Sequence, residues 1–279
     1  MSKNVWFVTG SSSGFGRHLT EELLKQSYLV CATLRKPEVL ADLQAQFPDH
    51  LLTVSVDVTK PEQIRAAVEQ TVEKWGRIDV LANNAGYGLG GMIEDTPINQ
   101  IRDVFETNVF GALETIRAVL PTMRGQKSGV ILNLSSVVGL VSYRGGGFYA
   151  ATKHALEAIS ESLSIEVGSW GIKVVAIEPG PFRTDFAGRS FVWPTTRLPE
   201  YDELYNTTFD IYNRMNGNQA GDPIKAVQLM IEVSESENPP LRLPMGQFAL
   251  EEVELLIESL TTDKEAWRQR ILDTDYPKG

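Results

Sequence analysis

Short apolar runs of strand length alternate with segments of helical period along most of the chain. The runs are mostly continuous rather than alternating in polarity, which is typical of strands buried on both faces of a parallel sheet. Strands that alternate with helices in this way indicate repeated βαβ units. Six strands are predicted, at residues 5–9, 29–34, 51–56, 78–82, 130–134 and 172–177.

Helix signals lie between these strands. A capping-box pattern at 59–62, with Pro61 in the first turn, predicts a helix that ends at Gly76. A second helix is predicted to open at Thr96 and Pro97, and Pro121 is expected to bend or end it near residue 125. Two further helices are predicted near the carboxyl terminus, at 249–260 and 264–272.

These elements predict an α/β protein: a Rossmann-type, doubly wound parallel sheet in three α/β/α layers. No repeat or linker divides the 279 residues, so we predict a single domain. Residues 1–180 would form a cofactor and catalytic framework. The alternation of strand-like and helix-like segments stops over residues 181–221. This segment is rich in aromatic side chains, and we predict that it forms a substrate lid. Residues 222–279 would add the carboxyl-terminal helices.

Charge and composition exclude several partners. The net charge of −10 and the pI of about 4.9 disfavour nucleic acid and anionic membrane surfaces, which require basic faces. No apolar run approaches the roughly 18 residues of a membrane span. The single cysteine, Cys31, cannot form an intrachain disulfide, and no secretory segment is evident. We therefore expect a cytoplasmic protein.

A glycine-rich loop follows the first predicted strand and opens a helix. Its glycines allow the backbone to turn tightly and to approach a pyrophosphate, while the helix amino terminus offers N–H groups and partial positive charge. The loop is therefore interpreted as a dinucleotide cradle. Its candidate cofactor-binding residues are Gly10, Ser12, Ser13, Gly14, Phe15 and Gly16.

The Gly-x-x-x-Gly-x-Gly spacing of this loop resembles that of the short-chain dehydrogenase/reductase superfamily, in its shorter, single-domain branch. The resemblance continues, in order, at the ends of successive predicted strands, where open α/β sheets hold ligands. It implies a nicotinamide-dependent oxidoreductase, similar to estradiol and retinol dehydrogenases. The matching residues are Asp57, Asn83 to Gly86, Asn108, Ser135, Ser136, Tyr149, Lys153, Pro179 and Gly180.

Tyr149 and Lys153 are the candidate acid/base pair. A helix places residues four apart on one face, so the phenol and the ammonium are expected to share one space. The ammonium and a cationic oxidised nicotinamide would both lower the tyrosine pKa from about 10. Tyr149 would then donate a proton in reduction and accept one in oxidation.

The resemblance adds two residues to this site. It selects Ser136 rather than Ser135 to hydrogen-bond the substrate carbonyl oxygen. It also assigns Asn108 to a water-mediated proton relay that leads to Lys153, and it assigns Lys153 to the nicotinamide ribose.

Arg35 decides the predicted cofactor. Leu34, at the end of the second strand, cannot accept hydrogen bonds from a ribose diol, whereas Arg35 suits a 2′-phosphate, with Ser12 as a second donor. We predict NADP(H), with NAD(H) possible, because Arg35 could also be a solvated surface charge. The resemblance assigns the remaining cofactor contacts to Asp57, Val58, Asn83, Ala85, Gly86, Pro179, Gly180, Phe182 and Thr184.

The substrate-facing segments are largely apolar and predict a bulky hydrophobic or aromatic ketone or alcohol. The aromatic residues could equally pin the lid to the core. No cluster has metal-ligand spacing, so no catalytic metal is expected. The candidate walls come from residues 86–95, residues 137–148 and the aromatic segment after Pro179; the apolar candidates in the first two are Leu89, Met92, Val138, Val141, Tyr143 and Phe148.

Two other functions fit the sequence less well. A non-catalytic dinucleotide sensor would have lost part of the Asn-Ser-Tyr-Lys set, which is complete here. A sugar-nucleotide epimerase or dehydratase would carry a second domain. By family resemblance, a homodimer or homotetramer is expected, formed through the helices that begin near Thr96 and Tyr149.

Overall fold

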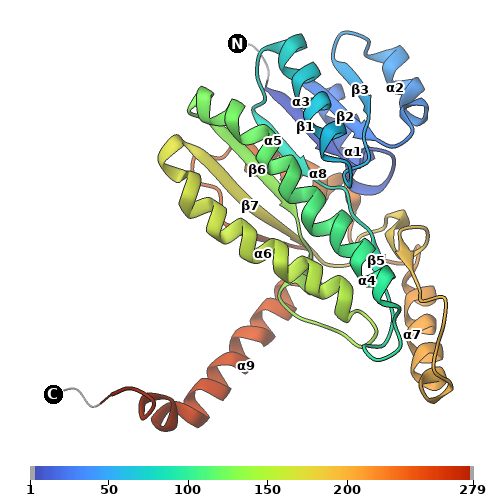
Figure 1. Cartoon of the computed structure of the whole chain (residues 1–279), viewed down its shortest axis with the longest axis vertical. Helices are drawn as coiled ribbons and strands as arrows, with labels where there is room; N and C mark the ends of the chain where they lie inside the picture. Colours follow the sequence, from blue (N-terminus) through green and yellow to red (C-terminus); the bar gives the residue numbers. More distant parts are fainter. Residues whose placement is uncertain (1–3, 277–279) are drawn as a thin grey trace.

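Seven strands form one parallel sheet in the computed structural model, which describes residues 4–276 (Figure 1). Their order is β3-β2-β1-β4-β6-β7-β9, so the winding reverses between β1 and β4. Such a reversal is where open α/β sheets bind ligands, beyond the carboxyl ends of the strands. The strands are β1 (Val5–Thr9), β2 (Leu29–Leu34), β3 (Leu51–Ser55), β4 (Val80–Asn83), β6 (Gly129–Leu134), β7 (Ile172–Pro179) and β9 (Arg242–Met245).

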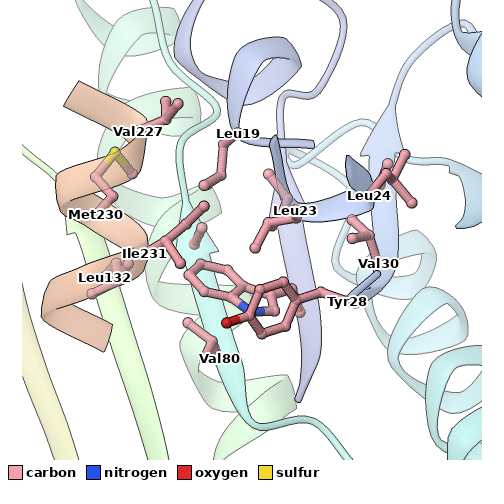
Figure 2. Close-up of a cluster of buried hydrophobic side chains, with 14 of the residues drawn as sticks. Leu19, Leu23, Leu24, Tyr28, Val30, Val80, Leu132, Val227, Met230 and Ile231 are labelled. Carbon is pink, nitrogen blue, oxygen red and sulfur yellow. The ribbon is translucent and has the colours of Figure 1, made fainter. Parts of the chain in front are cut away.

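Helices cover both faces of this sheet. One face packs against α1 and α8, where Leu19 and Leu23 meet Met230 and Ile231 (Figure 2). The other face packs against α3, α5 and α6. The predicted three-layer Rossmann-type architecture is confirmed. The helices are α1 (Gly14–Lys25), α2 (Ala41–Gln46), α3 (Pro61–Trp75), α4 (Ile98–Phe105), α5 (Gly111–Gln126), α6 (Gly147–Val167), α7 (Asp202–Met215), α8 (Pro223–Glu235) and α9 (Gln247–Leu272).

The central strands explain why the apolar runs are continuous. In β1, Trp6 and Val8 enter the cluster beneath α1 and α8, while Phe7 enters the cluster on the opposite face. Every residue of β1 is buried. A strand that is covered on both sides carries apolar side chains on both of its faces. It therefore lacks the alternation of polar and apolar residues that a half-exposed strand shows.

A seventh strand, β9, is absent from the sequence prediction. It is only four residues long and contains a charged Arg242 and a proline, Pro244, so it lacks an apolar run. It pairs with β7 alone, at the edge of the sheet, where proline is tolerated. The predicted start of β4 at residue 78 is also two residues early, since the strand begins at Val80.

Three helix predictions differ from the structure in detail. Thr59 does not cap α3, because its side chain donates to Asp57 and Lys60 occupies the N-cap position. Pro121 lies inside α5 rather than at its end, although the helix does end at Gln126, near residue 125 as predicted. The Gln126 side-chain amide hydrogen-bonds the backbone of Ile78 at 2.8 and 3.0 Å. The two predicted carboxyl-terminal helices are one continuous helix, α9.

Short elements complete the part of the chain described here. A two-residue strand pair joins the loop after β4 to the segment after β7. Within residues 4–276, no helix is both long enough and apolar enough to cross a membrane. The short elements are β5 (Gly88–Leu89), β8 (Phe191–Val192), the π-helical turn η2 (Glu106–Phe110) and the 3-10 turns η1 (Pro37–Leu40), η3 (Val137–Gly139), η4 (Gly168–Trp170), η5 (Asp185–Ala187) and η6 (Pro199–Tyr201).

Candidate functional site

One cavity of about 1440 Å³ lies beyond the carboxyl ends of β1, β2, β3, β4, β6 and β7. It is larger than the roughly 300–1,000 Å³ of common small-molecule sites, so it can hold an extended ligand together with a second molecule. Most of the predicted site residues line it. These are Gly10, Ser12, Ser13, Gly14, Phe15, Arg35, Asp57, Val58, Ala85, Gly86, Ser136, Tyr149, Lys153, Pro179, Gly180, Phe182 and Thr184.

The glycine loop is held by close backbone contacts. Gly10 has a φ of +70°, and a Cβ there would lie 2.8 Å from the Cα of Ala85. A Cβ on Gly16 would lie 2.4 Å from the carbonyl oxygen of Gly10, so Gly16 permits the helix to pack against the loop. Gly16 does not line the cavity, and its predicted cofactor contact is replaced by this packing role.

Asn84 locks the loop in this shape, and the sequence analysis did not single it out. Its side-chain amide donates to the carbonyl oxygens of Thr9 at 2.9 Å and Gly10 at 3.0 Å. The predicted neighbour, Asn83, instead points into the protein and donates to Asn133 at 2.9 Å. The prediction that Asn83 lines the cofactor site is therefore wrong, because the last residue of β4 alternates into the core.

The amino terminus of α1 faces the cavity. Its N-cap residue is Ser13, and within the described chain the Ser13 side chain forms no capping hydrogen bond. The first-turn N–H groups and the helix dipole are thus available to an anion. Gly14 adopts a φ of +54°, and only the Thr184 side chain lies within 4 Å of a Cβ placed there. The loop therefore fits a dinucleotide pyrophosphate.

Arg35 and Asp57 line the cavity just beyond the ends of β2 and β3. Arg35 is exposed, and its guanidinium forms no hydrogen bond or ion pair with residues 4–276. Burial alone would raise the pKa of Asp57, but hydrogen bonds from Thr59 and the charge of Arg35 leave that pKa lowered. Arg17, by contrast, is paired with Glu21 and Asp42 at 2.5 Å each.

Tyr149 projects from the first turn of α6 among aromatic rings. Its ring centroid lies 5.4 Å from that of Phe186 and 6.3 Å from that of Phe191. Burial raises the pKa of Tyr149, a hydrogen bond with Ser136 lowers it, and Tyr212 raises it further. The net direction is upward, so the phenol is protonated at neutral pH.

Lys153 lies one helical turn after Tyr149. Its Nζ donates to the carbonyl oxygen of Leu134 at 2.5 Å and lies 5.6 Å from the centroid of the Tyr149 ring. Burial lowers the pKa of Lys153 to about 8, and the charge of Glu157 opposes that shift. Without a cofactor the pKa of Tyr149 is raised rather than lowered, because burial is the largest influence on it. The lowering expected from Lys153 together with a cationic nicotinamide stays a prediction.

Asn108 lies behind Lys153 in η2 and does not line the cavity. Its Oδ1 accepts from the N–H of Tyr87 at 3.0 Å, and its Nδ2 donates to the Tyr87 carbonyl at 2.8 Å. A second donation reaches Thr152 at 3.1 Å. A Cβ on Gly86 would meet both Asn108 and the Lys153 amine, so these groups are close neighbours. Asn108 thus fixes the loop after β4 against α6.

Ser136 caps the turn η3 at the edge of the cavity. Its Oγ accepts from the N–H of Val138 and donates to the carbonyl oxygen of Pro179, both at 3.3 Å. The hydroxyl is therefore tied to the end of β7 and adjoins Tyr149. The preceding residue, Ser135, is almost fully buried beside Glu157.

The apolar side of the cavity is built largely from a segment the sequence analysis treated as irregular. Val138 and Tyr143 line it as predicted, but Leu89, Met92, Val141 and Phe148 do not. Helix α7 supplies the missing wall, and its signal was the helical spacing of Tyr205, Phe209 and Tyr212. The predicted substrate-facing segment after Pro179 contributes Phe186, Phe191, Val192, Thr207, Thr208, Ile211, Tyr212 and Met215, whereas Phe248 lies outside the predicted walls.

Two buried glutamates lie on the opposite side of Lys153. Glu157 follows it by one turn of α6, and Glu178 comes from β7. Burial raises the pKa of both carboxyl groups, and their mutual repulsion raises that of Glu178 further. Arg242 lies 3.5 Å from one and 3.9 Å from the other. The pair therefore holds a proton in the pH range where ordinary glutamates are ionised.

No group of three or more His, Cys, Asp or Glu side chains within residues 4–276 is arranged to hold a metal ion.

Known proteins resemble this chain over most of its length. The model of the short chain dehydrogenase family matches residues 4–194. Oxidoreductase BOA17 of Botryotinia fuckeliana is 37% identical over 266 residues, which covers 95% of this chain and 97% of that protein. Retinol dehydrogenase 8 of Homo sapiens is 35% identical over 248 residues, covering 84% and 79% of the two chains.

Solved structures agree with this result. A short-chain dehydrogenase from Streptomyces avermitilis superposes with a TM-score of 0.90 at 38% identity and covers 99% of this chain and 100% of its own. The closed form of serine dehydrogenase complexed with NADP+ superposes with a TM-score of 0.72 at 28% identity, covering 86% and 94%.

Proposed function

The chain belongs to the short-chain dehydrogenase family and is an NAD(P)-dependent dehydrogenase, and from this premise we propose its reaction. It interconverts a bulky hydrophobic or aromatic ketone and the corresponding secondary alcohol, with NADP(H) as cofactor. One observation carries the proposal: Tyr149, Ser136 and Lys153 line one cavity together with the glycine loop and a group of aromatic side chains.

Tyr149 is the proton donor to the substrate oxygen in the direction of reduction. Its raised pKa keeps the phenol protonated, so the Oη proton is available to a ketone oxygen. Ser136, whose one O–H donates to the Pro179 carbonyl in this structure, would turn that O–H to the same oxygen and stabilise the negative charge that develops there. In oxidation, Tyr149 must first lose its proton, and its phenolate, favoured by Lys153 and by the cationic nicotinamide, would then accept the hydroxyl proton. The nicotinamide supplies or accepts the hydride when it is bound.

Lys153 and Asn108 support this proton transfer. Lys153 titrates near pH 8, and its Nζ is already oriented by the Leu134 carbonyl. It would hold the nicotinamide ribose and keep positive charge near Tyr149. Asn108 lies within reach of the same amine and fixes the turn at Gly86. A water held there would return protons to Lys153 from outside.

The 2′-phosphate of NADP would be bound by Arg35 and Ser12. Arg35 borders the cavity with its guanidinium unpaired within the described chain, whereas Arg17 nearby is neutralised by two carboxylates. Leu34 offers no carboxylate for a ribose diol. The pyrophosphate would lie on the first turn of α1, at Gly14 and Phe15.

The substrate would occupy the side lined by α7 and Phe248. Phe186 and Phe191 flank the Tyr149 ring, and Ile211, Tyr212 and Met215 extend the apolar wall. Burial of apolar substrate surface stabilises the complex by about 25 cal/mol per Å². We assign residues 181–221 the role of a substrate-covering segment on these grounds.

A screen of ketones of graded size and polarity tests the proposal. Purified protein is mixed with NADPH or NADH, and the absorbance of the reduced nicotinamide is followed. We expect kcat/KM to rise with apolar bulk and to be higher with NADPH. Turnover of small polar carbonyls alone would contradict the apolar pocket, and a preference for NADH would contradict the role of Arg35.

A further inference from the structure

Helix α9 leaves the body of the protein and extends into solvent (Figure 1). It has 26 residues, and Ala249, in its first turn, is its buried residue. Contacts with the body involve β9 and η3, near the start of the helix. At 1.5 Å per residue, α9 is about 39 Å long. Every described residue from Ile257 onward is exposed.

Seven positions of α9, most of them apolar, follow a heptad repeat. Spacings of three and four alternate without interruption, which places these positions on one stripe of the helix. Six of the seven positions are apolar, and Lys264 is the exception. The stripe consists of Leu250, Val253, Ile257, Leu260, Lys264, Trp267 and Ile271.

A helix in this state requires a partner. Most helical stability in proteins comes from packing of an apolar face, which residues 257–272 lack on their own body, and local pairs such as Arg268 with Glu265 add only a few tenths of a kcal/mol. A contiguous exposed apolar stripe is rare on monomeric proteins and marks an interaction surface. The heptad spacing further specifies the partner as another helix packed along the seam.

The charges on α9 identify that helix as a second α9 in antiparallel orientation. Residues 247–261 carry four glutamates and no cation, whereas residues 262–272 carry three cations and two acidic residues. Antiparallel pairing places the acidic half of each copy against the cationic half of the other. With the midpoint at Thr261, Glu254 lies across from Arg268 of the second copy. Parallel pairing would instead oppose the glutamates.

We propose that two copies of this chain associate by antiparallel pairing of their α9 helices, with the stripe from Leu250 to Ile271 as the seam. The first turn of each α9 stays packed against its own subunit. Antiparallel pairing therefore places the two subunits at opposite ends of the helix pair. Lys264, a polar residue within the seam, selects the register, as single polar core residues do in coiled coils. This surface differs from the one expected by family resemblance.

Paired charge substitutions on the full chain test the seam. Ile257 lies in the stripe and is 60% exposed, whereas Leu255 lies outside it and is 58% exposed, so the two are matched in exposure and chemistry. We expect Ile257→Asp to weaken self-association at least about tenfold, and Leu255→Asp to change it by less than about twofold, as measured by sedimentation equilibrium. Circular dichroism checks that both variants are folded.

Several outcomes would overturn the proposal. A wild-type chain that is monomeric at roughly 100 µM has no pairing of useful affinity. Association that survives Ile257→Asp unchanged belongs to another surface. Equal losses for the two variants would assign the effect to charge rather than to the seam.

Introduced cysteines test the orientation. The natural cysteine, Cys31, is buried and serves as the background. Near the twofold axis, Leu260→Cys would meet its own copy and form an intermolecular disulfide under mild oxidation. Trp267→Cys would not, because its two copies are then separated by about 18 Å along the pair. Crosslinking of both variants would show parallel pairing, and crosslinking of neither would show that the helices do not meet.

Discussion

The floor and the roof of the cavity are built by different forces. The floor comprises residues 9–16, 83–86, 134–136 and 149–153, and it is held by backbone contacts and directed hydrogen bonds. The roof comprises residues 185–215 and is held mainly by ring contacts, such as Trp193 with Phe209 at 4.3 Å and Phe191 with Tyr212 at 4.4 Å.

This difference assigns the chemical step to the floor and substrate specificity to the roof. Hydrogen bonds and close backbone approaches require particular atoms at fixed positions, so the floor tolerates little change. Apolar contacts are non-directional and tolerate exchange of side chains of similar volume. The roof is joined to the body by a few polar anchors, among them the Tyr205 hydroxyl, which donates to Asp95 at 2.6 Å. Substrate range can therefore vary in the roof while the floor is unchanged.

The largest effect is expected at the centre of the floor. Tyr149→Phe removes the proposed proton donor and retains the ring contacts, so turnover should fall by about 10²–10⁴-fold. Dinucleotide affinity, measured by fluorescence titration, should change by less than about twofold. A variant with more than a few per cent of the wild-type rate would assign the proton transfer to another group.

The glycine loop gives the next largest effect. Gly10→Ala places a Cβ 2.8 Å from the Ala85 backbone at a φ of +70°, so dinucleotide affinity should fall by at least about tenfold. Gly125→Ala is the control, because nothing lies within 4 Å of a Cβ there and alanine favours a helix. Equal affinities for the two variants would show that the cradle is not needed.

Arg35 distinguishes the two cofactors. Arg35→Ala should raise the KM for NADPH by about tenfold and leave the KM for NADH within about twofold. Arg17→Ala is the matched control, since Arg17 is already neutralised by Glu21 and Asp42. If KM rises equally for both cofactors, Arg35 contributes general positive charge rather than phosphate recognition.

The roof should respond through the substrate alone. Ile211 lines the cavity and is 58% exposed, so Ile211→Ala has little folding cost and should raise the KM of bulky apolar ketones about three- to tenfold. The KM of small ketones and of NADPH should be unchanged. Ile98→Ala, at 60% exposure but outside the cavity, should change none of these values.

The smallest effect concerns stability and the carboxyl pair beside the floor. The pKa of Glu178 is raised in the folded protein, so the folded state binds more protons than the unfolded state above about pH 4.3. Stability should therefore decline as the pH rises from that value through the raised pKa. Glu178→Gln removes the titration and should flatten the decline in Tm by a few degrees between pH 5 and 8. An unchanged slope in the variant would assign the decline to other groups.

The strands and the floor of the site could be predicted from the sequence to a large extent. Strands such as β1 and β6 carry apolar side chains on both faces because helices cover both faces of the sheet. The resulting continuous apolar run can be recognised in the sequence. Glycine positions and the spacing of Tyr149 and Lys153 are likewise local properties. Errors on the floor arose where a side chain could point either way: Asn83 enters the core, and Asn84 holds the loop.

The edge strand, the roof and the projecting helix were harder to predict, each for a physical reason. Strand β9 forms because the backbone of β7 is available to pair with it, although its own sequence is short and is interrupted by Arg242 and Pro244. The wall that α7 gives the cavity depends on contacts between residues far apart in the chain, such as Phe191 with Tyr212. The continuity of α9 through Thr261 and Thr262 is not evident from helix propensity.

The sequence by itself determined the layered sheet, the cradle and the spacing of the acid/base helix, because period, glycine placement and helical spacing act over a few residues. Only the tertiary structure decided the pKa of Tyr149, since that depends on Phe186, Ser136 and Tyr212 gathering around one hydroxyl. It also decided which apolar residues line the cavity and which remain exposed on α9. Burial is a property of the assembled chain, and the same apolar residue serves as core, wall or seam according to what surrounds it.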